Sequence, residues 1–562
     1  MTSAEEIDIR DTVRAELLGP GGLFEVAEES VRGRDHLVFV NRKRSLREMV
    51  EAAAERGETE FLVLGDQRVT YDEFVGQVGA VAAWLSDRGV GAGDRVAILA
   101  ANRPEWIVTF FGAASMGAIV TALNGWWTAH ELAAALDLTT PRVLIGDRRL
   151  MARVPVDHRP ATLVEIESSF GDLIAKPGPL PDVPISEDDA ALILFTSGTT
   201  GRPKGATISH RGLIGFVQSM IYNGAERVFV QARLGKDSVP PGQLITLATS
   251  PLFHVSGLFG STLMAVEIGG KLVFREGRFD PADVLRLLEQ ERVTSWSAIG
   301  GMGPKVLDCP DLASRDLSSV TNLGFGGAPV GPELQDRLRD AFANAASAMG
   351  MGYGSSESVA VATSIGGEDF IERPTSCGTA NVGFEVEVRG PDGVVLPDGL
   401  DGEVFVRSAY TMLGYWNDPE ATSEVLDVDG WLAMGDIGHF DAGWLHLNSR
   451  ARDMIVRSAE NVHPFEIEYR LDAHPDVVES AVVGVDHPEL GQEVKAVVVT
   501  RPGIELAPAT LSAWVGETLA AFKVPSLWAI GTEPLPRNAA GKIVKRALVE
   551  AVEDGLSHPD PV

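Results

Sequence analysis

Residues 190–205 read AALILFTSGTTGRPKG, and the interpretation of the chain starts from this stretch. The apolar run at residues 190–195 is bounded by polar sequence, which is typical of a buried strand. It continues into Thr196–Gly201, six residues with four hydroxyls and two glycines, followed by Arg202 and Lys204. Hydroxyls, unobstructed glycine amides and cations are the groups that a polyphosphate needs. The stretch therefore predicts a strand that ends in a phosphate-binding loop.

This loop is not a Walker P-loop, which requires Gly, four residues and then Gly-Lys-Ser/Thr. Pro203 stands five residues after Gly198, and Lys204 is followed by Gly205. A Gly/Thr turn beside a strand would explain this stretch alone equally well. The interpretation therefore depends on its agreement with segments elsewhere in the chain.

Residues 196–205 resemble the phosphate-binding signature of the adenylate-forming superfamily, which comprises acyl-CoA synthetases, carrier-protein-loading adenylation domains and luciferases. The family pattern is a Ser/Thr/Gly run that ends in Pro-Lys-Gly. The resemblance implies an enzyme that activates a carboxylate with ATP as an acyl-adenylate, releases pyrophosphate and passes the acyl group to a thiol. It gives Lys204 a catalytic role and assigns these residues to the nucleotide: Thr196, Ser197, Gly198, Thr199, Thr200 and Gly201.

Length, charge and cysteine content limit the possible classes of protein. A chain of 562 residues is too long for one ordinary domain. Asp and Glu (79) exceed Lys and Arg (48), and the net charge of −31 argues against nucleic acid or anionic lipid as a partner. Cys309 and Cys377 form no disulfide framework and fit a reducing compartment. With neither a signal-peptide pattern nor an apolar run of about 18 residues, we expect a cytoplasmic protein without integral membrane association.

The order of the segments predicts an α/β protein with two parts. Apolar strands near residues 95–99 and 117–123 alternate with helical segments, which is typical of α/β layers with a largely parallel sheet. Short alternating strands at residues 378–407 indicate an antiparallel, β-barrel-like subdomain. We expect a large N-terminal domain (residues 1–450) that binds ATP and the acid, a hinge near residues 450–453, and a small mobile α+β C-terminal domain (residues 453–562).

Two glycine-dense segments resemble nucleotide-binding motifs of the family. Tyr353-Gly354-Ser355-Ser356-Glu357 is similar to its Tyr-Gly-x-Thr-Glu motif. The resemblance implies that Tyr353 lies along the adenine, that Ser356 holds a phosphate oxygen and that Glu357 binds Mg²⁺, for which oxygen ligands are usual. It assigns these further residues to the nucleotide: Gly354, Ser355, Gly327, Ala328 and Pro329.

Later motifs resemble the ribose-binding, hinge and catalytic segments of the family. Asp436 and Arg450 stand where the family contacts ribose, and Arg452 stands at the hinge about which the small domain rotates. Lys542 stands in the C-terminal Pro-x-x-x-x-Gly-Lys pattern, where it would bridge the carboxylate and the α-phosphate and stabilise developing charge. Taken singly, each is an ordinary turn or surface residue, so the inference depends on their joint order.

The acyl end is marked by fewer signals. His254 stands in a Pro-Leu-Phe-His segment, where the resemblance implies a gate or a group that polarises the carboxylate. A structural histidine at the end of a strand is the plain alternative. We assign Phe253, Ile299, Gly300 and Gly301 to the substrate pocket, which two glycines would widen.

We conclude that the sequence predicts an AMP-forming acid–thiol ligase, an acyl-CoA synthetase that uses ATP, Mg²⁺ and coenzyme A. A medium- or long-chain fatty acid is the leading substrate, with an aryl or steroid-type acid as the alternative. Ser458 and Ala459 replace two glycines that border the thiol path in relatives, so a carrier-protein thiol, an amine or nitrite stays open as the acceptor. A non-catalytic ATP- or acyl-AMP-binding protein is the alternative of another class. The sequence leaves the oligomeric state open.

Overall fold

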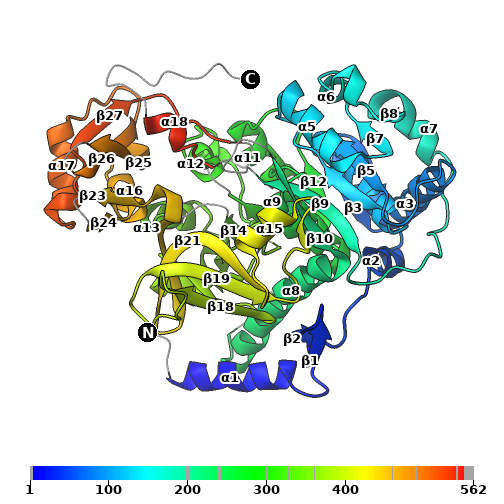
Figure 1. Ribbon diagram of the computed structural model, residues 1–562, viewed down its shortest axis with the longest axis horizontal. Helices are drawn as coiled ribbons and strands as arrows, with labels where there is room; N and C mark the ends of the chain where they lie inside the picture. Colours follow the sequence, from blue (N-terminus) through cyan, green and yellow to red (C-terminus); the bar gives the residue numbers. More distant parts are fainter. Residues whose placement is uncertain are drawn as a thin grey trace.

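The computed structural model describes residues 4–196, 203–236, 242–298, 301–326, 330–359, 361–457, 460–487, 490–538 and 542–549. Within these residues the N-terminal part contains two large sheets with helices between and around them (Figure 1). Its helices are α1 (Ala4–Leu18), α2 (Leu46–Ala53), α3 (Tyr71–Ser86), α4 (Pro104–Ala114), α5 (Ala129–Thr139), α6 (Arg148–Met151), α7 (Gly171–Ile174), α8 (His210–Arg233), α9 (Val255–Gly257), α10 (Met264–Ile268), α11 (Pro281–Gln290), α12 (Met302–Leu307), α13 (Pro332–Ala341), α14 (Glu368–Glu372) and α15 (Pro419–Val425).

The first sheet has, in the described part of the chain, seven strands in the order β20-β10-β9-β6-β5-β7-β8. Strands β5 to β9 are parallel, as the alternation of strands and helices predicts. Thr196 at the end of β9 pairs with Lys204 at the start of antiparallel β10, so both ends of the phosphate-binding stretch lie side by side. The strands are β5 (Arg95–Leu99), β6 (Ile119–Ala122), β7 (Val143–Gly146), β8 (Thr162–Glu165), β9 (Ala190–Thr196), β10 (Lys204–Ser209) and β20 (Gly414–Tyr415).

The second and larger sheet changes from parallel to antiparallel pairing after β15. Its order is β18-β19-β21-β22-β17-β16-β15-β14-β13-β11-β12-β3-β4. The antiparallel segment confirms the expected change of character, but among the described strands this path ends at β18 and does not close into a barrel. The strands are β3 (Glu60–Leu64), β4 (Gln67–Thr70), β11 (Ile245–Ala248), β12 (Lys271–Phe274), β13 (Ser295–Ser297), β14 (Asn322–Gly326), β15 (Met349–Tyr353), β16 (Thr363–Gly366), β17 (Ser376–Ala380), β18 (Phe384–Arg389), β19 (Gly402–Ser408), β21 (Trp431–Asp441) and β22 (Trp444–Arg450).

A separate small sheet carries the C-terminal part of the chain. Strand β22 of the large sheet ends at Arg450, a 3₁₀ turn covers Ala451–Asp453, and the next strand belongs to the small sheet. Figure 1 shows this C-terminal unit in orange and red beside the rest of the molecule. Its elements are β23 (Ile455–Arg457), β24 (Glu460–Val462), α16 (Pro464–Asp472), β25 (Val477–His487), β26 (Gly491–Thr500), α17 (Pro508–Gly516), β27 (Leu527–Gly531) and α18 (Arg546–Val549). A further hairpin, β1 (Val26–Val31) and β2 (Arg34–Phe39), lies near α1.

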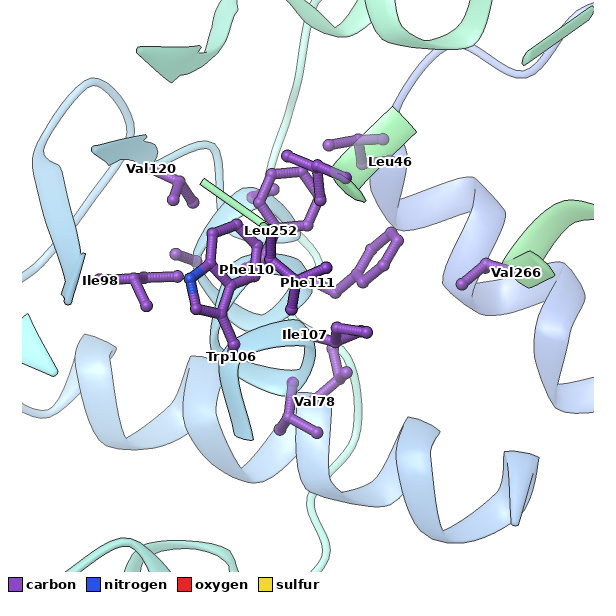
Figure 2. Packing of buried hydrophobic residues seen from close by; sticks show 14 of the residues in the cluster. Leu46, Val78, Ile98, Trp106, Ile107, Phe110, Phe111, Val120, Leu252 and Val266 are labelled. Atoms are coloured by element: carbon purple, nitrogen blue, oxygen red, sulfur yellow. The ribbon is translucent and has the colours of Figure 1, made fainter. Parts of the chain in front are cut away.

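Helix α4 is the central element of the main core. It is apolar around almost its whole circumference, which is typical of a helix that other elements enclose. It packs against β5 and β6 of the first sheet, against β3 of the second, and against α2 and α3. Figure 2 shows Trp106, Phe110 and Phe111 of this helix packed among side chains from both sides. The helix therefore packs between the two large sheets and contributes to the core that joins them.

No helix in the described ranges is both long and apolar enough to span a bilayer.

Trp106→Ala is expected to lower the free energy of unfolding by about 3–5 kcal/mol, because it leaves a large cavity in a fully buried site. Trp106→Phe is the matched control. The indole Nε1 has no hydrogen-bond partner among the described residues, so phenylalanine loses volume but no hydrogen bond. Denaturant titration of both variants checks this expectation, and a loss from Trp106→Phe as large as that from Trp106→Ala would contradict the cavity account.

Candidate active site

A cavity of about 2620 Å³ opens where the carboxyl ends of β9, β14 and β15 meet. Pockets at this edge of an α/β sheet are the usual ligand sites, and this one exceeds the roughly 300–1,000 Å³ that a single drug-sized ligand fills. Its wall includes residues of the C-terminal unit as well as of the N-terminal part. The predicted site residues along its wall are Thr196, Lys204, Phe253, His254, Gly354, Ser355, Ser356, Glu357, Arg450, Arg452 and Lys542.

Tyr353, Asp436 and Arg450 form one connected group at this cavity. The Tyr353 hydroxyl donates a hydrogen bond to Asp436 Oδ2 at 2.9 Å, and Arg450 Nε lies 3.2 Å from Asp436 Oδ1. Asp436 and Arg450 are directly opposite each other on β21 and β22, so sheet register holds them together. Burial and the neighbouring Asp436 raise the pKa of Tyr353 well above its usual range, so its phenol stays protonated and keeps donating. The structure therefore joins three of the residues assigned to adenine and ribose.

Glu357 and Lys204 form a second group, with Tyr415 of β20 between them. The Tyr415 hydroxyl donates to Glu357 Oε1 at 2.8 Å, and Lys204 Nζ lies 5.2 Å from the centre of the Tyr415 ring. Lys204 Nζ also lies 3.4 Å from Glu424, a largely exposed carboxylate. A carboxylate and an ammonium group are thus held by one tyrosine at the edge of the cavity. Tyr415 was not predicted from the sequence, which gives no local signal for it.

Lys542 reaches this cavity from the C-terminal unit. Burial lowers its pKa to about 8; the cations of Arg450 and Arg452 act in the same direction, while Asp436 and Glu357 oppose them. Its backbone N–H donates to Asn538 Oδ1 at 3.0 Å. The ammonium group therefore lies within the electrostatic influence of the predicted residues Glu357, Asp436 and Arg450, which are distant from it in sequence.

His254 is a neutral group at this cavity. Burial, and to a smaller degree the Lys542 cation, lowers its pKa to about 4. Its Nδ1 accepts from the Ser256 backbone N–H at 3.5 Å and lies 3.2 Å from the Ser256 hydroxyl. With Nδ1 as acceptor, the ring proton is on Nε2, and the imidazole can donate a hydrogen bond without carrying charge.

Small residues form one wall of the cavity over strands β13 to β16, and we call this wall the floor. In β14 and β15 the pattern NLGFG and MGMGY alternates, with glycine on the cavity side and Leu, Phe or Met on the other. The large residues pack into a core with α11 to α13. The sequence contains this period-two signal, from which the sequence analysis drew no prediction for these strands. The floor consists of Ser295, Ser297, Asn322, Gly324, Gly326, Gly350, Gly352, Ser364 and Gly366.

Helix α8 lies across the floor and presents one face to the cavity. Phe216, Met220, Asn223, Arg227 and Gln231 recur at spacings of four, three, four and four residues, which is one helical face. This face changes from apolar to polar toward the carboxyl end of the helix. The adjacent indoles Trp126 and Trp127 also line the cavity, beside Phe253 and Phe195.

Other site predictions have different outcomes. Gly301 is not part of the cavity wall, and a Cβ atom there would lie 3.4 Å from the Arg537 guanidinium. Its assignment to the substrate pocket stays a prediction, since an added Cβ atom would make only ordinary contact with Arg537, which itself lines the cavity. Arg452 lies in the 3₁₀ turn with a half-exposed side chain. The following predicted residues lie outside the described part of the chain: Ser197, Gly198, Thr199, Thr200, Gly201, Ile299, Gly300, Gly327, Ala328, Pro329, Ser458 and Ala459.

Comparison with known proteins places this site in a family. The family described as AMP-binding enzyme matches residues 49–416, and the AMP-binding enzyme C-terminal domain matches residues 466–542. The chain therefore belongs to the AMP-binding enzymes, and the predicted adenylate-forming class is confirmed at the level of the family. Helix α1 and the hairpin β1–β2 precede the matched region.

Individual relatives narrow the class to ligases. A feruloyl-CoA synthase from an Amycolatopsis species is 35% identical over 86% of this chain and 93% of its own length. A 7a-methyl-1,5-dioxo-octahydroindenyl-propanoyl:CoA ligase from Rhodococcus jostii is 32% identical over 89% of this chain and 97% of its own. A long-chain fatty acid–CoA ligase from Mycobacterium tuberculosis is 32% identical over 86% and 93%. These names agree with an AMP-forming acid–thiol ligase.

A solved structure of the amide bond synthetase McbA from Marinactinospora thermotolerans has the same fold. The TM-score is 0.77 at 28% identity, over 90% of this chain and 99% of that one. The name shows that a protein of this fold makes an amide rather than a thioester, so the acceptor has to be established separately for this chain.

Asp436→Asn is expected to lower the pKa of Lys542 below about 8, because it removes a negative charge that favours the ammonium form. NMR titration of isotope-labelled, dimethylated lysines, with Lys542→Arg to assign the signal, measures this value. Asp401→Asn is the control, since that carboxylate pairs with His439 and is not among the groups that act on Lys542. An unchanged or higher pKa in Asp436→Asn would contradict the electrostatic coupling.

Proposed function

We propose that this chain is an acyl-CoA synthetase that converts a carboxylic acid, ATP and coenzyme A into acyl-CoA, AMP and pyrophosphate. In the first half-reaction a carboxylate oxygen attacks the α-phosphorus of ATP and pyrophosphate leaves. In the second, the CoA thiolate attacks the acyl carbon and AMP leaves. The observation that carries the proposal is Lys542 of the C-terminal unit, which lines one cavity with Glu357, Arg450 and His254.

In the first half-reaction Lys542 stabilises negative charge. With a pKa of about 8 it is mostly an ammonium ion at neutral pH. Phosphate oxygens would favour this charged form further, because opposite charges nearby raise the pKa of a lysine. His254, neutral at this pH, donates a hydrogen bond to the acid and orients its carboxylate without forming a competing salt bridge.

Mg²⁺ is proposed as the metal, with Glu357 as its protein ligand. The fit is good, because Tyr415 occupies only one carboxylate oxygen by a 2.8 Å hydrogen bond, and hard cations prefer oxygen ligands. When bound, the ion would supply charge neutralisation to the phosphates.

The second half-reaction is proposed to follow a rotation of the C-terminal unit. We assign residues 1–450 to the ATP- and acid-binding domain and residues 453–562 to the mobile domain, with the hinge at Arg452. A short 3₁₀ turn between two different sheets, with a half-exposed arginine, is suited to absorb a change of φ and ψ. Rotation would withdraw Lys542 and bring residues 457–461 toward the thiol path.

The acid is proposed to be long and largely apolar. The floor of small residues leaves room between α8 and the large sheet, and Phe216 and Met220 provide apolar contact. A medium- or long-chain fatty acid fits this space, and so does a fused-ring or aryl acid of the kinds named in the relatives. Acid-dependent release of pyrophosphate, screened over alkyl, aryl and fused-ring acids, tests the activity and selects the class. No release with any acid would favour a non-catalytic binding protein.

Lys542→Ala is expected to slow acyl-adenylate formation by about two orders of magnitude or more, the usual effect of losing one preorganised charge contact. Thioester formation from preformed acyl-adenylate should change much less, because the lysine has then left the site. Lys523→Ala is the matched control, since this lysine of the same unit pairs with Glu466 and does not line the cavity. Equal losses in both half-reactions would refute the two-conformation account.

Acyl-CoA is expected to accumulate at a rate comparable with acyl-adenylate formation when acid, ATP, Mg²⁺ and CoA are supplied. Mass spectrometry of the products measures both species. If acyl-adenylate accumulated without thioester, and turnover required an amine, nitrite or a carrier protein, one of these would be the acceptor instead of CoA.

A further inference from the structure

The far end of the cavity contains the guanidinium group of Arg227, which has no ion-pair partner among the residues that the structure describes. Arg227 of α8 lines the cavity and lies over Gly366 of β16, where an added Cβ atom would stand only 2.6 Å from its Nη2. Among the described residues it forms no hydrogen bond and no ion pair within 4 Å. Burial lowers its pKa, with partial compensation from Asp369 and Glu226, yet an arginine stays charged at any physiological pH.

The carboxylates nearest to Arg227 are bound by other arginines. Arg10 Nη1 lies 2.8 Å from Asp369, and Arg14 Nε lies 2.7 Å from Glu226. Both arginines belong to α1, which Figure 1 shows at the bottom, beside the lower end of α8. Helix α1 therefore occupies the counter-charges that Arg227 would otherwise use, and leaves its donors available to a ligand.

The position of Arg227 along the floor determines how far a group bound by Arg227 lies from the reacting carboxylate. Gly366 pairs with Gly350 at the amino end of β15, whereas Gly354 and Glu357 follow the carboxyl end. At roughly 3.3 Å per residue, Gly350 and Gly354 are separated by about 13 Å along the strand. Between these two levels the face of α8 is apolar at Phe216 and Met220 and polar from Asn223 onward.

Asn223 adds a second polar group one helical turn before Arg227. Its Nδ2 donates to Ser364 Oγ at 3.0 Å and to Asn381 Oδ1 at 2.9 Å, which fixes the orientation of the amide. Ser364 in turn donates to Asn381 at 2.6 Å. The polar end of the cavity is thus an ordered hydrogen-bond network. The apolar part of the α8 face lies between this network and the catalytic end of the cavity.

We infer that the far end of the cavity binds an oxygen acceptor of the substrate, and that Arg227 is the specificity-determining donor. The substrate class is a carboxylic acid whose apolar body separates the reacting carboxyl from a distal ketone oxygen. The donors of Arg227 are available to this oxygen because Arg14 and Arg10 already pair with Glu226 and Asp369. This inference rests on the proposed acyl-CoA synthetase function and narrows its substrate.

The test uses two pairs of acids that differ only in ketone oxygen: decanoic and 9-oxodecanoic acid, and octahydroindenyl-propanoic acid with and without its ring ketones. In at least one pair the full-length wild-type enzyme should prefer the keto acid about 10- to 100-fold in kcat/KM, the usual range for a hydrogen bond to a charged donor. The effect should lie mainly in KM, because this contact is the same before and during the reaction.

Arg227→Met keeps the length of the side chain and removes its donors, so the preference for the keto acid should be lost while activity on the plain acid is retained. Arg227→Lys, which keeps one charged donor, should restore part of it. Arg233→Met is the matched control on the same helix, because Arg233 pairs with Glu16 and does not line the cavity. Calorimetric binding of each acid without ATP gives a second measurement that does not require turnover.

The possible results distinguish a failure of the inference about Arg227 from a failure of the proposed acyl-CoA synthetase function. Acid-dependent pyrophosphate release without any preference for ketones, or a preference that Arg227→Met retains, would overturn the inference and leave the proposed function intact. Equal loss of activity on both acids of a pair in Arg227→Met would also overturn it, because it would indicate a structural role. Absence of pyrophosphate release with every acid would contradict the proposed function. Calorimetry would still show whether Arg227 makes the keto acid bind more tightly than the plain acid.

Discussion

The alternation of large and small residues in strands β13 to β16 is the constraint on which the site depends. One face of these strands carries Leu, Phe, Met and Tyr, which the helices α11 to α13 bury in a core. The other face carries glycine, serine and asparagine, and these short side chains leave space between the sheet and α8. Because a register shift of one residue would exchange the two faces, the core that stabilises the sheet also fixes the cavity beside it.

Charge is distributed so that an acidic chain can still bind an anion. With a net charge of −31, the molecule as a whole repels nucleotides, and local cations have to overcome this. Lys542 of the C-terminal unit, and Arg450 and Arg452 at the turn that leads into it, supply them, but burial of Lys542 disfavours its charged form, and its pKa is about 8. A phosphate in the cavity would relieve this cost, so the position of the C-terminal unit and the presence of nucleotide are expected to favour each other.

The sequence predicted those features that are local or that carry a known motif. The buried strand before Thr196, the parallel order of β5 to β9 and the presence of Glu357, Arg450 and Lys542 at one cavity agree with the order of the motifs. Features that depend on tertiary packing were missed. That the glycines of MGMGY form a cavity wall depends on partner strands that are distant in sequence, and nothing near Tyr415 or Arg227 in sequence indicates that either lines the cavity. The contact between Gly301 and Arg537 likewise depends on how the C-terminal unit packs.

The two ends of the cavity place different demands on the cation that serves them. In the proposed reaction the charge at the catalytic end acts on phosphate in one half-reaction and leaves in the next, so a lysine on a separate unit is suitable. Its ammonium group also titrates, which couples its action to its surroundings. At the far end the cation only has to distinguish acids, and Arg227 is anchored on a helix of 24 residues that the core and α1 hold in place. A permanent guanidinium on a rigid element therefore suits the proposed recognition, because its contact with the acid would persist through the proposed rotation of the C-terminal unit.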